Sequence, residues 1–203
     1  MKIFCIGRNY ADHVKELKNE LPTEPLIFMK PPTALLLDGK PFYYPDFTQD
    51  LHHEIEIVLR ISKAGKHIEP QFAHKYFDAV ALGIDFTARD LQEKLKSKGN
   101  PWEIAKGFDG SAVLGKFLPL SEFEDLQNID FQLTKNKITV QHGNTSDLIF
   151  HFDVLISHIS KYFTLQQGDV IYTGTPAGVG AVQIGDRLEG FIGEKLLLEC
   201  DIK

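Results

Sequence analysis

Short apolar runs separated by turn residues predict a fold made mostly of strands. Lys2–Gly7 (KIFCIG) and Leu26–Lys30 (LIFMK) end at a glycine or directly before prolines, as strands do. Ala79–Asp85 (AVALGID) is a continuous apolar run that ends in an acid, the pattern of a buried strand that delivers a residue to a site. Leu165–Ile171 and Val182–Leu188 resemble each other, and we interpret both as turns that enter strands.

The stretch DLHHEIEIVLRI (Asp50–Ile61) predicts a strand with two different faces, because successive side chains of a strand point to opposite sides. One face is apolar and is expected in the core: Leu51, His53, Ile55, Ile57, Leu59 and Ile61. The other face carries His52, Glu54, Glu56, Val58 and Arg60. From the pattern alone, this second face is either exposed to solvent or directs Glu54 and Glu56 at a common target.

Two stretches have the spacing of helices. The first is Arg8–Leu21, with Asn9 as the expected N-cap. Its apolar side consists of Tyr10, Val14, Leu17 and Leu21. The second is Thr87–Gly99, with Thr87 as the expected cap and Gly99 as the end. Together with the strands, these helices predict a single α+β domain over residues 1–203, dominated by β-structure.

Composition narrows the class of protein further. The 203 residues are 43% hydrophobic and 25% charged, as in ordinary globular proteins. Lys and Arg number 22 against 28 Asp and Glu, so the formal charge of −6 argues against a nucleic acid or an anionic membrane as partner. Cys5 and Cys200 form neither a zinc motif nor a disulfide framework. With no basic leader and no apolar run of about 20 residues, we expect a cytoplasmic protein.

Three acids could form a metal site. Glu54 and Glu56 stand two apart on a predicted strand, so their Cα atoms lie roughly 6.5–7 Å apart and their side chains can converge on one ion. Asp85 is the natural third ligand, and hard divalent cations such as Mg²⁺ prefer oxygen ligands. The alternative is an amphipathic strand whose glutamates meet only water. His53 is not expected to be a ligand. His52 could at most contact a ligand without binding the metal itself.

His13 and Glu16 could form a general base. They stand three apart on a predicted helix, which brings their side chains within reach of a hydrogen bond. Such a pair is expected to raise the pKa of the histidine, to fix its tautomer and to make it a base for water. The alternative is an exposed glutamate beside a histidine that only packs.

The following stretches occur in this order along nearly the whole chain: GRNYADHVKEL, FMKPPTALL, LHHEIEIVLRI, ALGIDFTARDLQ, PWEIAKGFDGSAVLG, GNTSDLIF and GDVIYTGTPAGVG. They resemble the fumarylacetoacetate hydrolase family in its short, single-domain branch. The resemblance implies a mixed β-roll or barrel-like fold with a few short helices, including an N-terminal lid helix, and a homodimer. The chain departs from the pattern at Val140, where many relatives carry a basic residue, and at Ala181, where proline is common.

The resemblance also implies roles for individual residues. Glu54, Glu56 and Asp85 would hold Mg²⁺ or Mn²⁺. His13 and Glu16 would activate water on a helix that orders over bound substrate, and Lys106 would bind a substrate oxygen beside the metal. Arg8, Arg89, Gln92 and Thr175 would contact the substrate.

The implied substrate is a small 2-oxo acid that chelates the ion through its carboxylate and 2-oxo oxygens. Our first hypothesis is hydrolysis of acylpyruvates (2,4-diketo acids) to pyruvate and a carboxylate, with oxaloacetate decarboxylation as a related activity, both through a pyruvate enolate that the metal stabilises. A second is an isomerase or tautomerase of 2-hydroxy-diene dioates or oxaloacetate. The third is a non-catalytic, metal-stabilised binding module. The presence of both His13 and Glu16 favours hydrolysis, because isomerisation needs no oriented base for water.

Overall fold

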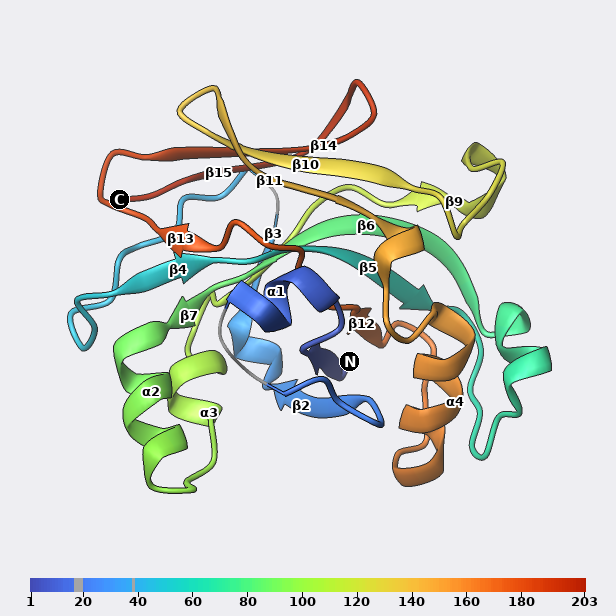
Figure 1. Ribbon diagram of the computed structural model, residues 1–203. Helices are drawn as coiled ribbons and strands as arrows, with labels where there is room; N and C mark the ends of the chain where they lie inside the picture. The colour runs from blue at the N-terminus through green and yellow to red at the C-terminus, as the bar shows by residue number, and fades with distance from the viewer. Residues whose placement is uncertain (17–19, 38) are drawn as a thin grey trace.

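The computed structural model describes residues 1–16, 20–37 and 39–203. Its centre is a curled, mixed sheet (Figure 1). The strands of this sheet are β1 (Ile3–Gly7), β2 (Leu26–Lys30), β3 (Leu35–Leu37), β5 (Ile55–Ile61), β6 (Phe77–Asp85), β8 (Ala112–Leu114), β9 (Leu118–Pro119) and β12 (Val170–Tyr172). They follow the order β2-β1-β12-β5-β6-β8-β3, and β9 also pairs with β6. The expectation of a β-dominated α+β fold with few helices is confirmed.

Two smaller sheets and several helices surround this centre (Figure 1). The first small sheet has the order β11-β10-β14-β15, from β10 (Asp130–Lys135), β11 (Ile138–Asn144), β14 (Arg187–Ile192) and β15 (Lys195–Asp201). The second has the order β13-β4-β7, from β4 (Leu51–His53), β7 (Thr87–Ala88) and β13 (Gly180–Ala181). The α-helices are α1 (Ala11–Glu16), α2 (Arg89–Ser97), α3 (Glu103–Lys106) and α4 (Phe152–Tyr162). Short 3₁₀ turns are η1 (Pro32–Ala34), η2 (Pro70–Lys75), η3 (Leu120–Glu122) and η4 (Thr145–Asp147).

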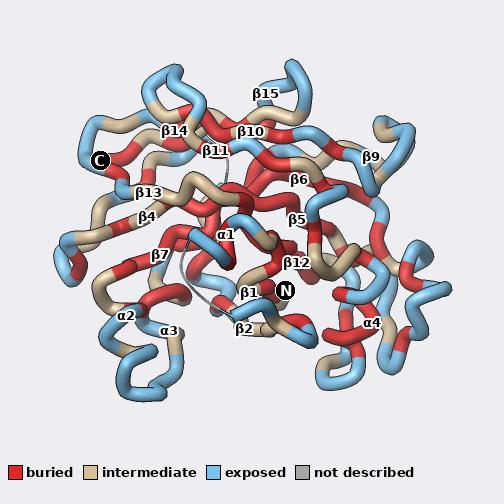
Figure 2. Tube along the Cα trace, viewed as in Figure 1, coloured by how far each residue is buried: buried red, intermediate tan, exposed pale blue. Residues whose placement is uncertain are grey.

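The central strands β5 and β6 are buried along most of their length (Figure 2). One face of β5 packs into the large core together with residues of the four-stranded sheet such as Phe131 and Leu198. The opposite face continues into a second apolar cluster that contains Val58, Ala81 and Tyr172. Because both faces of β5 are covered, the alternative of a solvent-exposed glutamate face is wrong.

The two similar sequence stretches near the C-terminus fold into similar turns. The backbone N–H of Gln166 donates to Asp169 Oδ2, and that of Gln183 donates to Asp186 Oδ2, each at 2.8 Å. The glycine before each aspartate adopts a positive φ. The predicted correspondence between these turns is therefore confirmed, down to the aspartate that accepts the same hydrogen bond in each.

The predicted N-terminal helix is only partly confirmed. Its described part is α1, which begins at Ala11 rather than Arg8. Tyr10 and Val14 are buried as expected, but Leu21 is 61% exposed and lies outside the helix. Leu17, the fourth residue of the expected apolar side, lies outside the described residues.

Both predicted helix caps are wrong, because Asn9 bonds to distant backbone groups and Thr87 bonds to the backbone two residues before it. Asn9 Oδ1 accepts a hydrogen bond from the N–H of Phe150 at 2.8 Å, and its Nδ2 donates to the carbonyl of Thr173 at 2.8 Å. Thr87 belongs to β7, and its hydroxyl donates back to the carbonyl of Asp85. Helix α2 starts at Arg89 without a side-chain cap. Its predicted end is confirmed, since Gly99 follows the helix at a φ of +67°.

Gly83 gives a test of the packing around β6. A Cβ at this position would lie 2.4 Å from Cε1 of Tyr172 and 2.7 Å from Cγ2 of Val58. Tyr172 is fully buried and its hydroxyl donates to the carbonyl of Val113, so the ring cannot move without cost. We expect Gly83→Ala to lower the free energy of unfolding by about 1–3 kcal/mol in urea melts. Gly180→Ala is the control, because its Cβ would meet nothing closer than 3.5 Å; equal stability of the two variants would contradict this packing.

Candidate functional site

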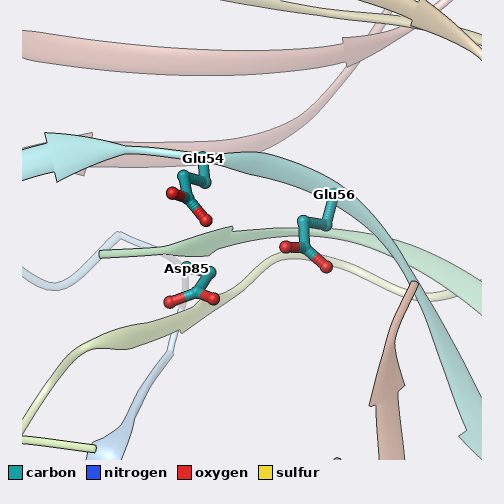
Figure 3. A group of neighbouring side chains, drawn as sticks. All are labelled: Glu54, Glu56 and Asp85. Atoms are coloured by element: carbon teal, nitrogen blue, oxygen red, sulfur yellow. The ribbon is translucent and has the colours of Figure 1, made fainter. Parts of the chain in front are cut away.

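The three acids Glu54, Glu56 and Asp85 converge at the junction of β5 and β6. These strands pair antiparallel, with Glu56 opposite Gly83, and the N–H of Asp85 donates to the carbonyl of Glu54 at 2.9 Å. One carboxylate oxygen from each of the three residues lies within 4.8 Å of the other two (Figure 3). All three side chains are buried. We call this group the carboxylate triad.

Three basic side chains contact two members of the carboxylate triad, Glu54 and Asp85. Lys106 Nζ donates to Glu54 Oε2 at 2.7 Å and to Asp85 Oδ2 at 2.8 Å. Arg89 donates to the other oxygen of Glu54. Lys30 Nζ lies 2.7 Å from Asp85 Oδ1. Buried carboxylates are stable only when such partners compensate for lost hydration, so these cations allow three acids to share one buried position.

The pKa values of the two glutamates move in opposite directions. Burial alone raises the pKa of Glu54, but the cations Lys106 and Arg89 outweigh it and bring the pKa well below its usual range. Burial also raises the pKa of Glu56, and the nearby charges of Asp85 and Glu54 raise it further, well above its usual range. The negative charge of Glu56 is therefore less compensated than that of Glu54. A cation bound beside Glu56 would be stabilised by this charge.

The donor set fits a hard divalent cation such as Mg²⁺ or Mn²⁺, which prefers carboxylate oxygens. Asp85 Oδ1 is buried and accepts no hydrogen bond from the residues that the structure describes. Lys30 Nζ forms an ion pair with this oxygen and donates to the carbonyl and hydroxyl of Ser111 and to the carbonyl of Phe86. Since three cations already balance three carboxylates, an added divalent ion would leave a positive site, suited to an anionic substrate.

The residues predicted from the sequence meet at one cavity of about 40 Å³ beside the carboxylate triad. Its lining includes every one of them except Glu16: Arg8, His13, Glu54, Glu56, Asp85, Arg89, Gln92, Lys106 and Thr175. They arrive from separate elements, with His13 on α1, Arg89 and Gln92 on α2, and Lys106 at the end of α3. Ile6, Gly7, Phe28, Lys96 and Trp102 complete the lining.

Glu16 lies behind His13 rather than at the cavity. Its Oε2 is 3.3 Å from His13 Nδ1, and its Oε1 accepts a hydrogen bond from the N–H of Gly178 at 3.1 Å. The contact with Glu16 raises the pKa of His13, as expected, but the net pKa is lower than the usual value. Burial lowers this pKa, and the opposing effects of Glu54 and Glu16 do not make up the difference. His13 is therefore neutral near pH 7, with Nδ1 directed at Glu16 and Nε2 left to act as a base.

Four further residues of the cavity have defined contacts or backbone conformations. Arg89 Nη1 donates to Gln92 Oε1 at 2.7 Å. Thr175 Oγ1 accepts a hydrogen bond from Gln141 Nε2 at 2.8 Å, so its own hydrogen can point toward a ligand. Arg8 adopts a φ of +60°, a left-handed conformation that is uncommon for a residue with a Cβ and that concentrates at functional sites.

Sequence reasoning missed Lys30 and Gln141. Lys30 ends an apolar strand directly before two prolines, and Asp85 likewise stands at the end of an apolar strand. Gln141 gave no local signal. Its side chain accepts a hydrogen bond from the N–H of Ile55 at 3.0 Å and donates to Thr175 and to the carbonyl of Pro176, so it ties the loop of Thr175 to β5.

The two adjacent histidines lie outside the carboxylate triad. His53 Nδ1 is 2.9 Å from Gln141 Oε1, and the ring is buried on the face of β4 turned away from the acids, as the strand alternation predicts. His52 Nε2 is 2.9 Å from Asp50 Oδ1. The prediction that His53 does not join Glu54 and Glu56 agrees with these contacts.

The sequence pattern of the whole chain decides its family. The model of the fumarylacetoacetate (FAA) hydrolase C-terminal family matches residues 2–200. The chain belongs to the fumarylacetoacetate hydrolase family. Among family members, the mitochondrial oxaloacetate tautomerase of Bos taurus is 42% identical over 201 residues, which cover 99% of this chain and 91% of that protein. The mitochondrial oxaloacetate decarboxylase of Dictyostelium discoideum is 40% identical, and the match covers 99% of this chain and 93% of that protein.

A solved structure of the family shows the same fold. The fumarylpyruvate hydrolase of Pseudomonas aeruginosa, in complex with Mn²⁺ and pyruvate, superposes with a TM-score of 0.93 at 35% identity. The match covers 100% of this chain and 89% of that one. These relatives are enzymes, and this one carries a divalent metal. The relatives' reactions differ, so membership in the family does not by itself specify the reaction of this chain.

No helix within residues 1–16, 20–37 and 39–203 is long and apolar enough to cross a membrane. Both sequence relatives are described as mitochondrial proteins, in contrast to the cytoplasmic location expected for this chain. The cytoplasmic location and the homodimer stay predictions.

Proposed function

We propose that this protein is a divalent-metal-dependent enzyme that moves a proton next to the carbonyl of a 2-oxo acid, with the keto and enol forms of oxaloacetate as its main substrates. One observation carries the proposal: a buried histidine in contact with Glu16 and a carboxylate triad face the same small cavity. The identity of 42% to an oxaloacetate tautomerase over nearly the whole chain supports this reaction over hydrolysis, our first hypothesis from the sequence.

The residues of the cavity divide the work. Glu54, Glu56 and Asp85 would hold the ion, which when bound supplies a Lewis acid that makes the hydrogens beside a 2-oxo group more acidic. Glu16 orients His13. His13 takes a proton from the carbon next to the 2-oxo group of the keto form and returns a proton to the 2-oxo oxygen to give the enol. Lys106 offers an ammonium group to the oxygen on which negative charge develops. The hydroxyl of Thr175 and the guanidinium of Arg89 orient the substrate carboxylate.

Hydrolysis of acylpyruvates is the second candidate. The contact between His13 Nδ1 and Glu16 favours it, because an oriented base suits the activation of water, and a fumarylpyruvate hydrolase shares the fold. Decarboxylation of oxaloacetate would use the same cavity without attacking water. The binding-module hypothesis is the weakest, since a buried triad, an oriented base and Lys106 are more than stability requires. We propose that residues 1–203 act as one catalytic domain.

The test is a substrate panel measured with Mg²⁺, Mn²⁺ and EDTA. We expect either metal to accelerate the conversion of enol- to keto-oxaloacetate above the uncatalysed rate, and EDTA to return it to that rate. If the hydrolysis of acetylpyruvate or fumarylpyruvate is faster than the tautomerisation of oxaloacetate, acylpyruvate hydrolysis becomes the main activity instead. Thermal stabilisation by Mg²⁺ without turnover of any 2-oxo acid would establish the binding module instead.

A further inference from the structure

Helix α2 presents a third polar residue to the cavity beyond the two that the family resemblance implies. Arg89, Gln92 and Lys96 are spaced i, i+3 and i+7, so they share one face of the helix. All three line the cavity. Lys96 is exposed, whereas Arg89 and Gln92 are buried, so Lys96 stands at the outer end of the cavity.

The position of Lys96 along the helix separates it from the carboxylate triad. Arg89 donates to Glu54 of the triad, and Lys96 follows seven residues later. At a rise of 1.5 Å per residue, their Cα atoms lie about 10 Å apart along the helix axis. Lys96 therefore faces the far end of a ligand whose near end lies at the acids.

Positive charge gathers at this outer end. Arg8 lines the same cavity, and its left-handed backbone is a conformation with a free-energy cost. Partial loss of hydration lowers the pKa of the otherwise exposed Lys96, and the charges of Arg8 and Arg89 lower it further, with Glu93 acting in the opposite direction. An anion held among these like charges would offset the repulsion between them.

We propose that Lys96, together with Arg8, binds the second carboxylate of a dicarboxylic 2-oxo acid, and that this contact makes the enzyme select dianionic over monoanionic substrates. The inference rests on the proposed function, because that function places the 2-oxo end of the substrate at the carboxylate triad. The charge of the site agrees with it: three cations already balance the triad, so a divalent ion leaves room for two negative charges.

The experiment compares two unreactive probes of equal length. 2-Oxoglutarate and 2-oxopentanoate have the same five-carbon chain, and only the first has a second carboxylate. Isothermal titration of the Mn²⁺-loaded protein should give at least tenfold tighter binding of 2-oxoglutarate, the size expected for a charge-assisted hydrogen bond. Lys96→Gln should weaken 2-oxoglutarate about tenfold and leave 2-oxopentanoate unchanged. It should also raise the KM for oxaloacetate about tenfold, with kcat within twofold.

Lys94→Gln is the matched control. Lys94 is an exposed lysine on the same helix and does not line the cavity, so its loss should change neither affinity. Equal affinities of the wild-type protein for the two probes, or equal weakening of both probes in Lys96→Gln, would overturn the role of Lys96 while metal-dependent turnover of oxaloacetate upheld the proposed function. Failure of the wild-type protein to bind either probe or to turn over oxaloacetate would overturn both.

Discussion

Glu56→Gln should reduce metal-dependent turnover of oxaloacetate by about a thousandfold or more, since a metal ion contributes several kcal/mol of transition-state stabilisation. The substitution keeps the shape of the side chain, and the amide oxygen can still accept the hydrogen bond from the N–H of Gly174, which lies 2.7 Å from Glu56 Oε2. What is lost is one of the three negative charges that, in the proposed function, would hold the ion. Steady-state rates at saturating Mn²⁺ measure the effect.

For the same variant we expect no loss of thermal stability in the absence of metal, in contrast to the loss of turnover. Burial and the charges of Asp85 and Glu54 raise the pKa of Glu56, which means that its ionised form is costly in the metal-free protein. Glu56→Gln should therefore leave the melting temperature without metal unchanged or higher, and should remove the increase that Mn²⁺ produces in the wild type. Glu69→Gln, at an exposed glutamate, is the control and should keep both activity and metal stabilisation. Full activity of Glu56→Gln would show that the triad does not hold the catalytic metal.

His13→Gln has the second largest expected effect. Removing the base should lower kcat for tautomerisation and for any acylpyruvate hydrolysis by about 10²–10⁴-fold, the usual contribution of general acid–base catalysis. Oxaloacetate decarboxylation should fall less, because it requires neither an attacking water nor removal of a proton from carbon. Equal loss of all three activities would show that His13 is not a dedicated base. His142→Gln, at an exposed histidine paired with Asp130, is the control.

The pH dependence of kcat/KM tests the same assignment. A base must be neutral to accept a proton, and burial lowers the pKa of His13 from its usual value of 6.5. We therefore expect kcat/KM to rise with pH through an inflection below 6.5 and to level off above it. The nearby charge of a bound divalent ion would shift this inflection in the same direction. His13→Gln should lose the inflection, and an inflection that persists in the variant would assign it to another group.

Much of the fold could be predicted locally. The strands at Lys2–Gly7, Leu26–Lys30 and Ala79–Asp85 agree with β1, β2 and β6, because apolar runs bounded by glycine and proline leave little other choice. The caps at Asn9 and Thr87 could not be predicted in this way. Both side chains can cap a helix. Asn9 bonds instead to the distant N–H of Phe150, which no local pattern shows, and Thr87 bonds to the carbonyl of Asp85, a local alternative to capping.

Part of the candidate site could also be predicted from local backbone geometry. Alternation along a strand placed Glu54 and Glu56 on one face and His53 on the other, and this depends only on backbone geometry. Their orientation toward the interior depends on what covers that face, here the cluster with Val58 and Tyr172. The effect of the Glu16 contact on the pKa of His13 could be predicted because the contact is local, whereas the burial that outweighs it is a tertiary property.

The sequence by itself determined the strands, the spacing of the candidate ligands and the family resemblance, since these depend on neighbours in the chain and on residue type. Only the tertiary structure decided that residues from α1, α2, α3 and the strand ends share one cavity, that Lys30 and Gln141 support it, and that Lys96 extends it. The physical reason is that burial, charge compensation and the closing of a cavity are set by groups far apart in the sequence, and local periodicity carries no information about which of them meet.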